Sequence, residues 1–250
     1  MIISFQNQKG GVGKTSSCVN VGYSLSQMGK SVLLVDLDPQ ANTTVNAGID
    51  DEKLDRTIYN LLTKKGAKAK DYIISTKYGM DLLPANIELA DADITLASAI
   101  NRESILRKIL EPIKNNWDYI LIDCPPNLGL LSLNALTASQ MVIIPVCPGF
   151  FSIKGLGRLF EIIGMVRENL LNPDITTKVL VTMYDAREKL YKDIMNGMVE
   201  NLGQDMIFKT KIRVNTAVKY SQEKQQPTAF YNKKCKAAVD YDQLAREVLE

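Results

Sequence analysis

The sequence predicts a doubly wound α/β fold, in which a mostly parallel sheet carries helices on both faces. Short apolar runs alternate with longer segments whose apolar residues recur at helical spacing, over the whole of residues 1–250. The runs are continuously apolar rather than alternating, which is typical of strands buried on both faces of a parallel sheet. At 250 residues and 46% hydrophobic composition, the chain can bury one large core, and we expect a single domain.

Each strand and helix is expected where one of these patterns begins and ends. The expected strands are Ile2–Phe5, Ser31–Asp36, Met80–Leu83, Tyr119–Asp123, Met141–Val146, Lys178–Met183 and Met206–Lys209. The expected helices are Thr15–Met28, Leu54–Leu62, Ser104–Ile113, Ile153–Asn169, Tyr191–Leu202 and Tyr241–Leu249. Right-handed crossovers bring the carboxyl ends of parallel strands to one edge of the sheet, where ligands bind in such folds.

A glycine-rich turn, KGGVGKTS over residues 9–16, separates the first strand from the first helix. Its glycines let backbone N–H groups converge on phosphate oxygens, and the helix N-terminus beyond them adds the positive end of its dipole. Lys14 supplies a cation for β- and γ-phosphates, and the Thr15 hydroxyl is a ligand for Mg²⁺. The ordinary P-loop has glycine at the position of Gln8, and Lys9 adds a second lysine. The predicted nucleotide-binding residues are Lys9, Gly10, Gly11, Val12, Gly13, Lys14, Thr15 and Ser16.

Three aspartates lie at or just beyond the carboxyl ends of two predicted strands. Asp123 ends the apolar run YILID, which is typical of a Walker-B strand that holds Mg²⁺ opposite a P-loop. Asp36 ends SVLLVD and Asp38 follows in the turn sequence LDPQ, where aspartate is also a common turn former. One of these two would orient the attacking water, and spacing alone does not say which. The predicted metal ligands are Thr15, Asp123 and Asp36, and Asp123 is also predicted to bind the nucleotide.

The composition excludes several kinds of site. The chain has no histidine, which removes Ser-His-Asp and Cys-His catalysis and histidine metal sites. Its four cysteines are widely spaced without a CxxC pair, so we expect reduced thiols rather than a zinc site or a disulfide framework. The net charge is +2, so a nucleic-acid role requires a local basic patch.

The sequence also predicts a cytoplasmic protein without membrane association. The start, MIISFQNQ, has neither the basic n-region nor the apolar h-region of a signal peptide. No stretch approaches the roughly 20 apolar residues that a membrane span needs. The segment Tyr241–Leu249 is short and acidic at its end, so we expect it to pack on the domain rather than bind a membrane.

These motifs together resemble the ParA family of partition ATPases, within the MinD/ParA class of deviant Walker-A proteins. Residues 9–44 look like the family's deviant Walker A and the segment after it, and residues 123–139 resemble its Walker-B stretch and the following helix. TMYDAR over residues 182–187 and QLAREVLE at the C-terminus also read as family segments. The resemblance covers nearly the whole chain.

The resemblance implies an ATP- and Mg²⁺-dependent homodimer. In the family, the lysine at the position of Lys9 reaches across the interface to the partner's phosphates, and the aspartate matching Asp38 positions the hydrolytic water. Lys9, Lys14 and Asp38 are therefore the predicted catalytic residues. By position, Met183 and Arg213 are candidates for contacts to the base.

A basic stretch near the C-terminus is the predicted DNA-binding surface. Between residues 209 and 236 eight lysines and arginines accompany a single acidic residue, with aromatic residues interleaved. A solvated basic surface is the alternative interpretation. In the family segment that aligns with Ile212–Ser221, Val214 and Ala217 replace two arginines, the second of which contributes to DNA binding in relatives. The predicted DNA-binding residues are Arg213, Lys219, Lys233 and Lys234 of this stretch, together with Arg187, which matches a position that contacts DNA in the family.

The function implied is plasmid or chromosome partition. The ATP-bound dimer would bind double-stranded DNA of the nucleoid without sequence preference, and a ParB-type centromere-binding partner would stimulate hydrolysis. A MinD-like regulator of the division site is the main alternative, and an iron-protein-like reductase with Cys124 and Cys147 at a dimer axis is another. In one departure, family members often carry Q-C-E-Y where this chain has Cys147, Pro148, Gly149 and Phe150.

Overall fold

A seven-stranded sheet forms the centre of the computed structural model, which describes residues 1–64, 66–147, 152–170, 172–185, 187 and 189–250. The strand order is β3-β4-β2-β5-β1-β6-β7, and every pairing is parallel except that of β3 with β4. The strands are β1 (Ile2–Phe5), β2 (Val32–Asp36), β3 (Ile74–Ser75), β4 (Asp81–Leu83), β5 (Tyr119–Asp123), β6 (Met141–Val146) and β7 (Thr176–Val181). The predicted mostly parallel sheet is confirmed.

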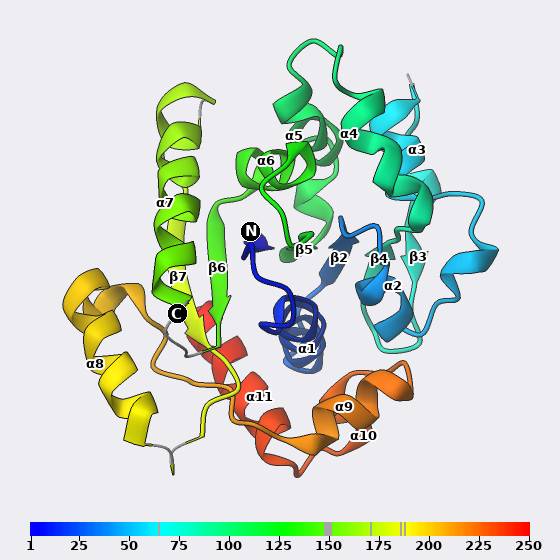
Figure 1. Cartoon of the computed structure of the whole chain (residues 1–250). Coiled ribbons are helices and arrows are strands. Elements are labelled where there is room, and N and C mark those ends of the chain that lie inside the picture. Colours follow the sequence, from blue (N-terminus) through cyan, green and yellow to red (C-terminus); the bar gives the residue numbers. More distant parts are fainter. Residues whose placement is uncertain (65, 148–151, 171, 186, 188) are drawn as a thin grey trace.

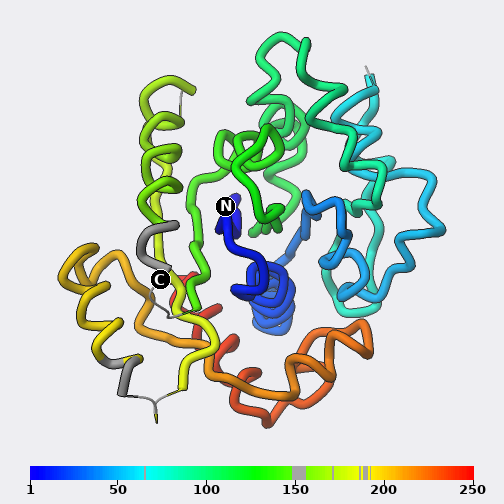
Figure 2. Tube along the Cα trace, in the orientation of Figure 1, coloured from blue at the N-terminus to red at the C-terminus, as the bar shows by residue number. Residues whose placement is uncertain are grey.

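Helices cover both faces of the sheet, as Figure 1 shows. The helices that the structure describes are α1 (Lys14–Gln27), α2 (Asn42–Asn46), α3 (Ile58–Thr63), α4 (Ala92–Thr95), α5 (Ile105–Leu110), α6 (Leu130–Ala138), α7 (Ser152–Asn169), α8 (Lys189–Leu202), α9 (Thr216–Glu223), α10 (Thr228–Tyr231) and α11 (Lys236–Leu249). In the view of Figure 1, α3 to α6 lie above the sheet, and α1 and α9 to α11 lie below it. The trace in Figure 2 shows the C-terminal segment returning beside α1, the first helix of the chain.

Alternate residues of the strands supply two separate cores. Ile2 of β1 packs with α3, α5 and α6 on one face, while Ile3 and Phe5 pack with α1 and α11 on the other. Because successive strand residues point to opposite faces, a strand buried on both sides must be apolar throughout. This explains the continuous apolar runs. A third core joins β6 and β7 to α7 and α8.

One expected strand, Met206–Lys209, is wrong. Ile207 makes only a single parallel bridge, to Val179, and a 3₁₀ turn over Gln204–Met206 precedes it. The backbone N–H of Lys209 donates to the Glu247 carboxylate of α11 at 2.9 Å instead of extending a ladder. A side chain from a helix far along the sequence therefore ends the pairing.

Several boundaries also differ from the expected ones. The helix expected over Leu54–Leu62 begins only at Ile58, after Thr57, whose backbone N–H donates to the Asn60 side chain at 3.1 Å. The last helix begins at Lys236, earlier than expected, and β7 ends at Val181 rather than at residue 183. The short antiparallel strand β3 was not predicted, since the sequence around it is polar.

Helix α1 lies very close to the sheet at Gly22. A Cβ built at this glycine would be 2.8 Å from Leu34 Cδ2 of β2 and 3.1 Å from Met80 Sδ. Glycine therefore permits the close approach that brings the start of α1, and with it the P-loop, to the strand ends.

We expect Gly22→Ala to lower the free energy of unfolding by about 1–3 kcal/mol, because the added methyl overpacks the core. Gly164→Ala in α7 is the matched control, since nothing lies within 4 Å of its Cβ position. There, alanine should stabilise the helix by about 1 kcal/mol at most. Urea unfolding measures both variants. Equal effects of the two substitutions would contradict the close packing.

Candidate nucleotide site

The glycine-rich turn connects β1 to α1 at the carboxyl edge of the sheet. Gly11 and Gly13 have φ of +71° and +89°, a left-handed conformation that favours glycine. Asn7 donates to Pro145 O of β6 at 2.7 Å, and Thr182, just after β7, donates from its hydroxyl to Val12 O at 2.8 Å. Hydrogen bonds to β6 and to the residue after β7 thus fix the position of the turn. Its left-handed glycines give the backbone a conformation that suits phosphate binding.

The two lysines of the turn have different surroundings. Lys14 is 7% exposed, and its Nζ donates to Lys9 O at 3.3 Å. Burial lowers the pKa of Lys14, while the nearby carboxylates of Asp123 and Asp38 oppose the shift. Lys9 is exposed, and its ammonium has no hydrogen-bond or ion-pair partner among the residues that the structure describes. Lys14 is thus held over the turn, and Lys9 is available to an external group.

Asp123, at the end of β5, joins the turn to the segment after β2. Its Oδ2 accepts hydrogen bonds from the hydroxyls of Thr15 at 2.7 Å and of Thr43 at 2.8 Å. Its Oδ1 is buried and has no hydrogen-bond partner among the residues that the structure describes. Burial raises the pKa of Asp123, and the two hydroxyl donors act in the opposite direction. A buried, unpartnered carboxylate oxygen beside a threonine hydroxyl fits a hard cation such as Mg²⁺, for which oxygen is the preferred ligand.

Asp36 and Asp38 occupy one turn but have different partners. Asp36 is fully buried, and its Oδ2 accepts from both the backbone N–H and the hydroxyl of Thr44 at 2.8 Å. Its Oδ1 accepts from the Asp38 N–H at 3.1 Å. Asp36, predicted as a metal ligand, therefore has both oxygens engaged in shaping the turn. Burial and the neighbouring Asp123 raise the pKa of Asp36.

Asp38 keeps one oxygen available. Its Oδ1 accepts from the Gln40 N–H at 3.0 Å, and its backbone oxygen accepts from the Ala41 N–H. Its Oδ2 has no partner among the described side chains and backbone groups. The side chain is 7% exposed and near enough to Lys14 and Asp123 to influence the pKa of each. This geometry distinguishes the two aspartates, which the spacing had left equivalent.

Thr43 and Thr44 are the site residues that the sequence reasoning missed. They follow the turn LDPQA and lie in the first turn of α2. Thr43 contacts Asp123, and the Thr44 hydroxyl also accepts from Ala85 N–H at 3.0 Å. A threonine pair after a turn is common in proteins, so the only usable signal was its position beyond the end of a buried strand.

The two residues predicted near the base lie beyond β7. Met183 has φ of 52° and is 39% exposed. Tyr184 forms a parallel bridge with Arg213, which brings the two segments side by side. The Arg213 guanidinium is bound to Asp240 of α11, with Nη2 2.6 Å from Oδ1, and this contact raises the pKa of Arg213. Arg213 therefore links the loop to α11.

The comparisons with known proteins agree with this geometry. A family model described as an AAA domain matches residues 1–177. Sporulation initiation inhibitor protein Soj of Bacillus subtilis (strain 168) is 40% identical over 99% of this chain and 97% of its own length. Chromosome partitioning protein ParA of Caulobacter vibrioides is 36% identical over 99% of this chain and 93% of its own length. The chain belongs to the ParA family of P-loop ATPases.

A solved structure shows how closely this ParA-family chain follows a nucleotide-binding relative. Cobyrinic acid a,c-diamide synthase from Mycobacterium smegmatis, with bound ATP analog and magnesium, matches with a TM-score of 0.87. The two are 32% identical, over 99% of this chain and 93% of that one. The fold of the ParA-family chain is thus that of a protein solved with a nucleotide and magnesium bound.

The predicted DNA-binding residues lie on the surface of this ParA-family chain. Lys219, Lys233 and Lys234 are exposed. Arg187 is exposed too and pairs with Asp185, whose pKa it lowers. The basic segment is docked on α1. There Gln222 donates to the Ser16 hydroxyl at 2.9 Å, and Asn20 Oδ1 accepts from Thr228 N–H at 2.7 Å.

Helix α11, the apolar character of the helices and the cysteines bear on the alternative interpretations. The apolar side of α11 is buried against α1, with Tyr241, Leu244 and Ala245 in the core, so it is covered by the protein itself. Among the described residues, no helix combines the length and apolar character needed to cross a membrane. The described residues form no disulfide bond, and Cys124 is fully buried. Of the four residues at which the chain departs from the family, Cys147 is described, whereas Pro148, Gly149 and Phe150 lie outside the described part of the chain.

We expect Asp123→Asn to weaken Mg²⁺-dependent ATP binding at least about tenfold, because an amide replaces one carboxylate oxygen of a cation site. Thr177→Val is the matched control, since the Thr177 hydroxyl is also buried without a partner but lies in β7. Titration of a fluorescent ATP analogue with and without Mg²⁺ measures the effect. Retention of the full Mg²⁺ dependence in Asp123→Asn would contradict the metal assignment.

Proposed function

We propose that this chain is an ATP-dependent partition ATPase for plasmid or chromosome segregation, and that it works as a homodimer. The observation that carries the proposal is the contrast between Lys9 and Lys14. Lys14 is buried over the turn, whereas Lys9 extends from it without a partner among the described residues. An exposed lysine beside a complete phosphate loop supports an interaction with a second subunit, as the ParA family leads us to expect.

ATP and Mg²⁺ are the proposed ligands. The backbone of Gly10 to Gly13 would cradle the phosphates, and Thr15 with Asp123 Oδ1 would hold the metal ion. When bound, Mg²⁺ would neutralise charge that develops on the phosphates. Lys14 would bind the β- and γ-phosphates in the same subunit. Lys9 would add charge from the partner subunit, so that the site is complete only in the dimer.

The proposed reaction is in-line attack of water on the γ-phosphate of ATP, which releases ADP and phosphate. The free Oδ2 of Asp38 would position that water, since the chain has no histidine to act as a base. The remaining oxygens of Asp38 are held by Gln40 and Ala41. A carboxylate fixed in this way limits the orientations of the water and raises the fraction of productive geometries.

The proposed partner of the ATP-bound dimer is double-stranded DNA, bound without sequence preference. Lys219, Lys233 and Lys234 are exposed on the α9–α11 segment, and Arg187 is exposed on the neighbouring loop. Arg213 carries less weight because Asp240 holds its guanidinium. A ParB-type centromere-binding protein would then stimulate hydrolysis, and the protein would act in the cytoplasm on the nucleoid.

DNA co-sedimentation with ATP, ADP or no nucleotide tests the switch. We expect the wild type to bind DNA with ATP alone and Lys9→Ala to lose this binding, because the variant lacks the lysine supplied to the partner. Lys68→Ala, an exposed lysine away from the turn, is the matched control. Equal binding by the wild type in every nucleotide state would overturn the mechanism.

A salt titration tests the DNA surface separately. Removing two phosphate contacts in Arg187→Ala with Lys219→Ala should reduce the slope of log affinity against log salt by about two. Lys68→Ala with Lys70→Ala is the matched control, with the same loss of charge elsewhere. An unchanged slope in the first double variant would exclude this surface.

A further inference from the structure

One aromatic ring of the C-terminal segment is half exposed and yet held in place. Phe230 of α10 is 53% exposed. Its ring meets the ring of Tyr78 edge to face, with centroids 4.9 Å apart, and the ring of Tyr23 in α1 at 6.4 Å. Such perpendicular contacts between aromatic rings are favourable. Phe230 therefore presents to solvent a ring that two tyrosines hold in position.

The turn between β3 and β4 reaches this ring from a distant part of the sequence (Figure 1). The Tyr78 hydroxyl donates to Gln225 O, between α9 and α10, at 2.9 Å, and 147 residues separate the two along the chain. Lys77 is exposed, and its Nζ lies 5.2 Å from the centre of the Tyr78 ring. This cation–π contact keeps the ammonium beside the aromatic rings. The fold thus brings a lysine from a distant segment to the surface around Phe230.

Three further lysines lie close to Phe230. Two follow it within four residues, so even an extended chain would keep their Cα atoms within about 14 Å of its own. The third is the C-cap residue of α9, next to Gln225. All three are exposed, and residues 224–239 contain no acidic residue. With the lysine of the β3–β4 turn they define what we name the phenylalanine surface, which consists of Phe230, Lys77, Lys224, Lys233 and Lys234.

The chemistry of the phenylalanine surface fits a strand of nucleic acid whose bases are unpaired. An exposed aromatic ring gives a base a surface to stack on, and lysines neutralise the phosphates on either side. None of the four lysines forms an ion pair within the described part of the chain, so their ammonium groups are available to phosphates. A duplex keeps its bases stacked on one another and presents mainly its phosphates, so the ring would gain little from it.

We propose that the phenylalanine surface binds single-stranded nucleic acid, with one unpaired base stacked on Phe230 and the lysines paired with the neighbouring phosphates. Because stacking does not read the edges of the bases, this binding is independent of sequence. The proposal goes beyond the duplex binding of the proposed function and requires neither ATP nor partition activity. Lys233 and Lys234 serve both kinds of nucleic acid, whereas Phe230 contributes only to the single strand.

Fluorescence anisotropy of the full chain with a labelled oligothymidylate, and with a duplex of equal length, tests the proposal. We expect Phe230→Leu to weaken single-strand binding about tenfold, because leucine is apolar but has no ring on which a base can stack. The same variant should leave duplex binding unchanged. Phe230→Tyr, which keeps the ring, should retain the affinity of the wild type for both.

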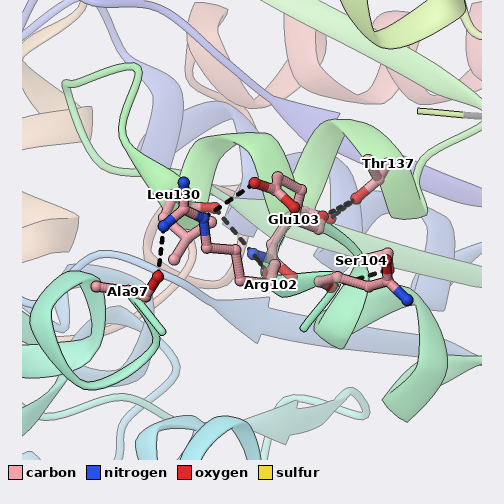
Figure 3. Close-up of polar contacts among 8 residues, drawn as sticks. Ala97, Arg102, Glu103, Ser104, Leu130 and Thr137 are labelled. Atoms are coloured by element: carbon pink, nitrogen blue, oxygen red, sulfur yellow. Dashed lines mark hydrogen bonds and ion pairs between the residues drawn. The ribbon is translucent and has the colours of Figure 1, made fainter. Parts of the chain in front are cut away.

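The lysine of the β3–β4 turn is tested by salt titration. Lys77→Ala should lower the slope of log affinity against log salt for the single strand by about 0.7, since one phosphate contact is lost. Lys108→Ala is the matched control, because this exposed lysine of α5 lies on the opposite face of the sheet (Figure 1). Figure 3 shows how the loop before α5 is anchored: Arg102 donates to the Glu103 carboxylate at 3.0 Å, and Thr137 of α6 donates to Glu103 O. The control should leave the slope unchanged.

The proposal is overturned if the wild type does not bind the single strand, or if Phe230→Leu binds it as the wild type does. Equal weakening of single-strand and duplex binding in Phe230→Leu would overturn it too. So would binding to vesicles of anionic lipid that requires Phe230 while single-strand binding does not. Single-strand binding that requires Phe230, without duplex binding in any nucleotide state, would support this inference and remove the proposed duplex partner. Thermal unfolding checks that each variant is folded.

Discussion

The carboxylate of Asp123 is the point on which the nucleotide site depends. Two hydroxyls, from Thr15 in the P-loop helix and Thr43 after β2, converge on one of its oxygens. Segments far apart in the sequence are thereby tied to the end of the central strand β5. The second oxygen is buried and has no partner in the described part of the chain, which is costly unless a ligand hydrogen-bonds or coordinates it. This unpartnered oxygen supports the proposal that Asp123 is part of a cation site.

The charged residues around this carboxylate differ in whether neighbouring groups of the protein already engage them. Asp36 uses both oxygens to hold its own turn, so that Asp38 can keep one oxygen free. Lys14 is buried near Asp123 and Asp38, while Lys9 is exposed. Asp36 and Lys14 are thus held inside the subunit, whereas Asp38 and Lys9 keep a charged group available to a ligand. This separation suits a site that is completed from outside the subunit.

The C-terminal segment extends the site to the surface of the molecule. Gln222 contacts Ser16 and the Thr228 backbone contacts Asn20, so α9 and α10 rest on the first turns of α1. The same segment carries the exposed lysines of the proposed DNA surface.

The sequence by itself determined the parallel sheet, the glycine-rich turn and the strand-terminal aspartates, because local apolar pattern and turn chemistry carry that information. Features that depend on contacts between distant parts of the sequence became known only from the tertiary structure. Glu247 ends the pairing expected over Met206–Lys209, and Asp240 binds Arg213, which the sequence had presented as a free cation. Thr43 became a site residue only when folding brought it to Asp123, 80 residues away along the chain. Such contacts depend on which distant segments become neighbours in the folded protein, and the spacing of residues along the sequence does not give that information.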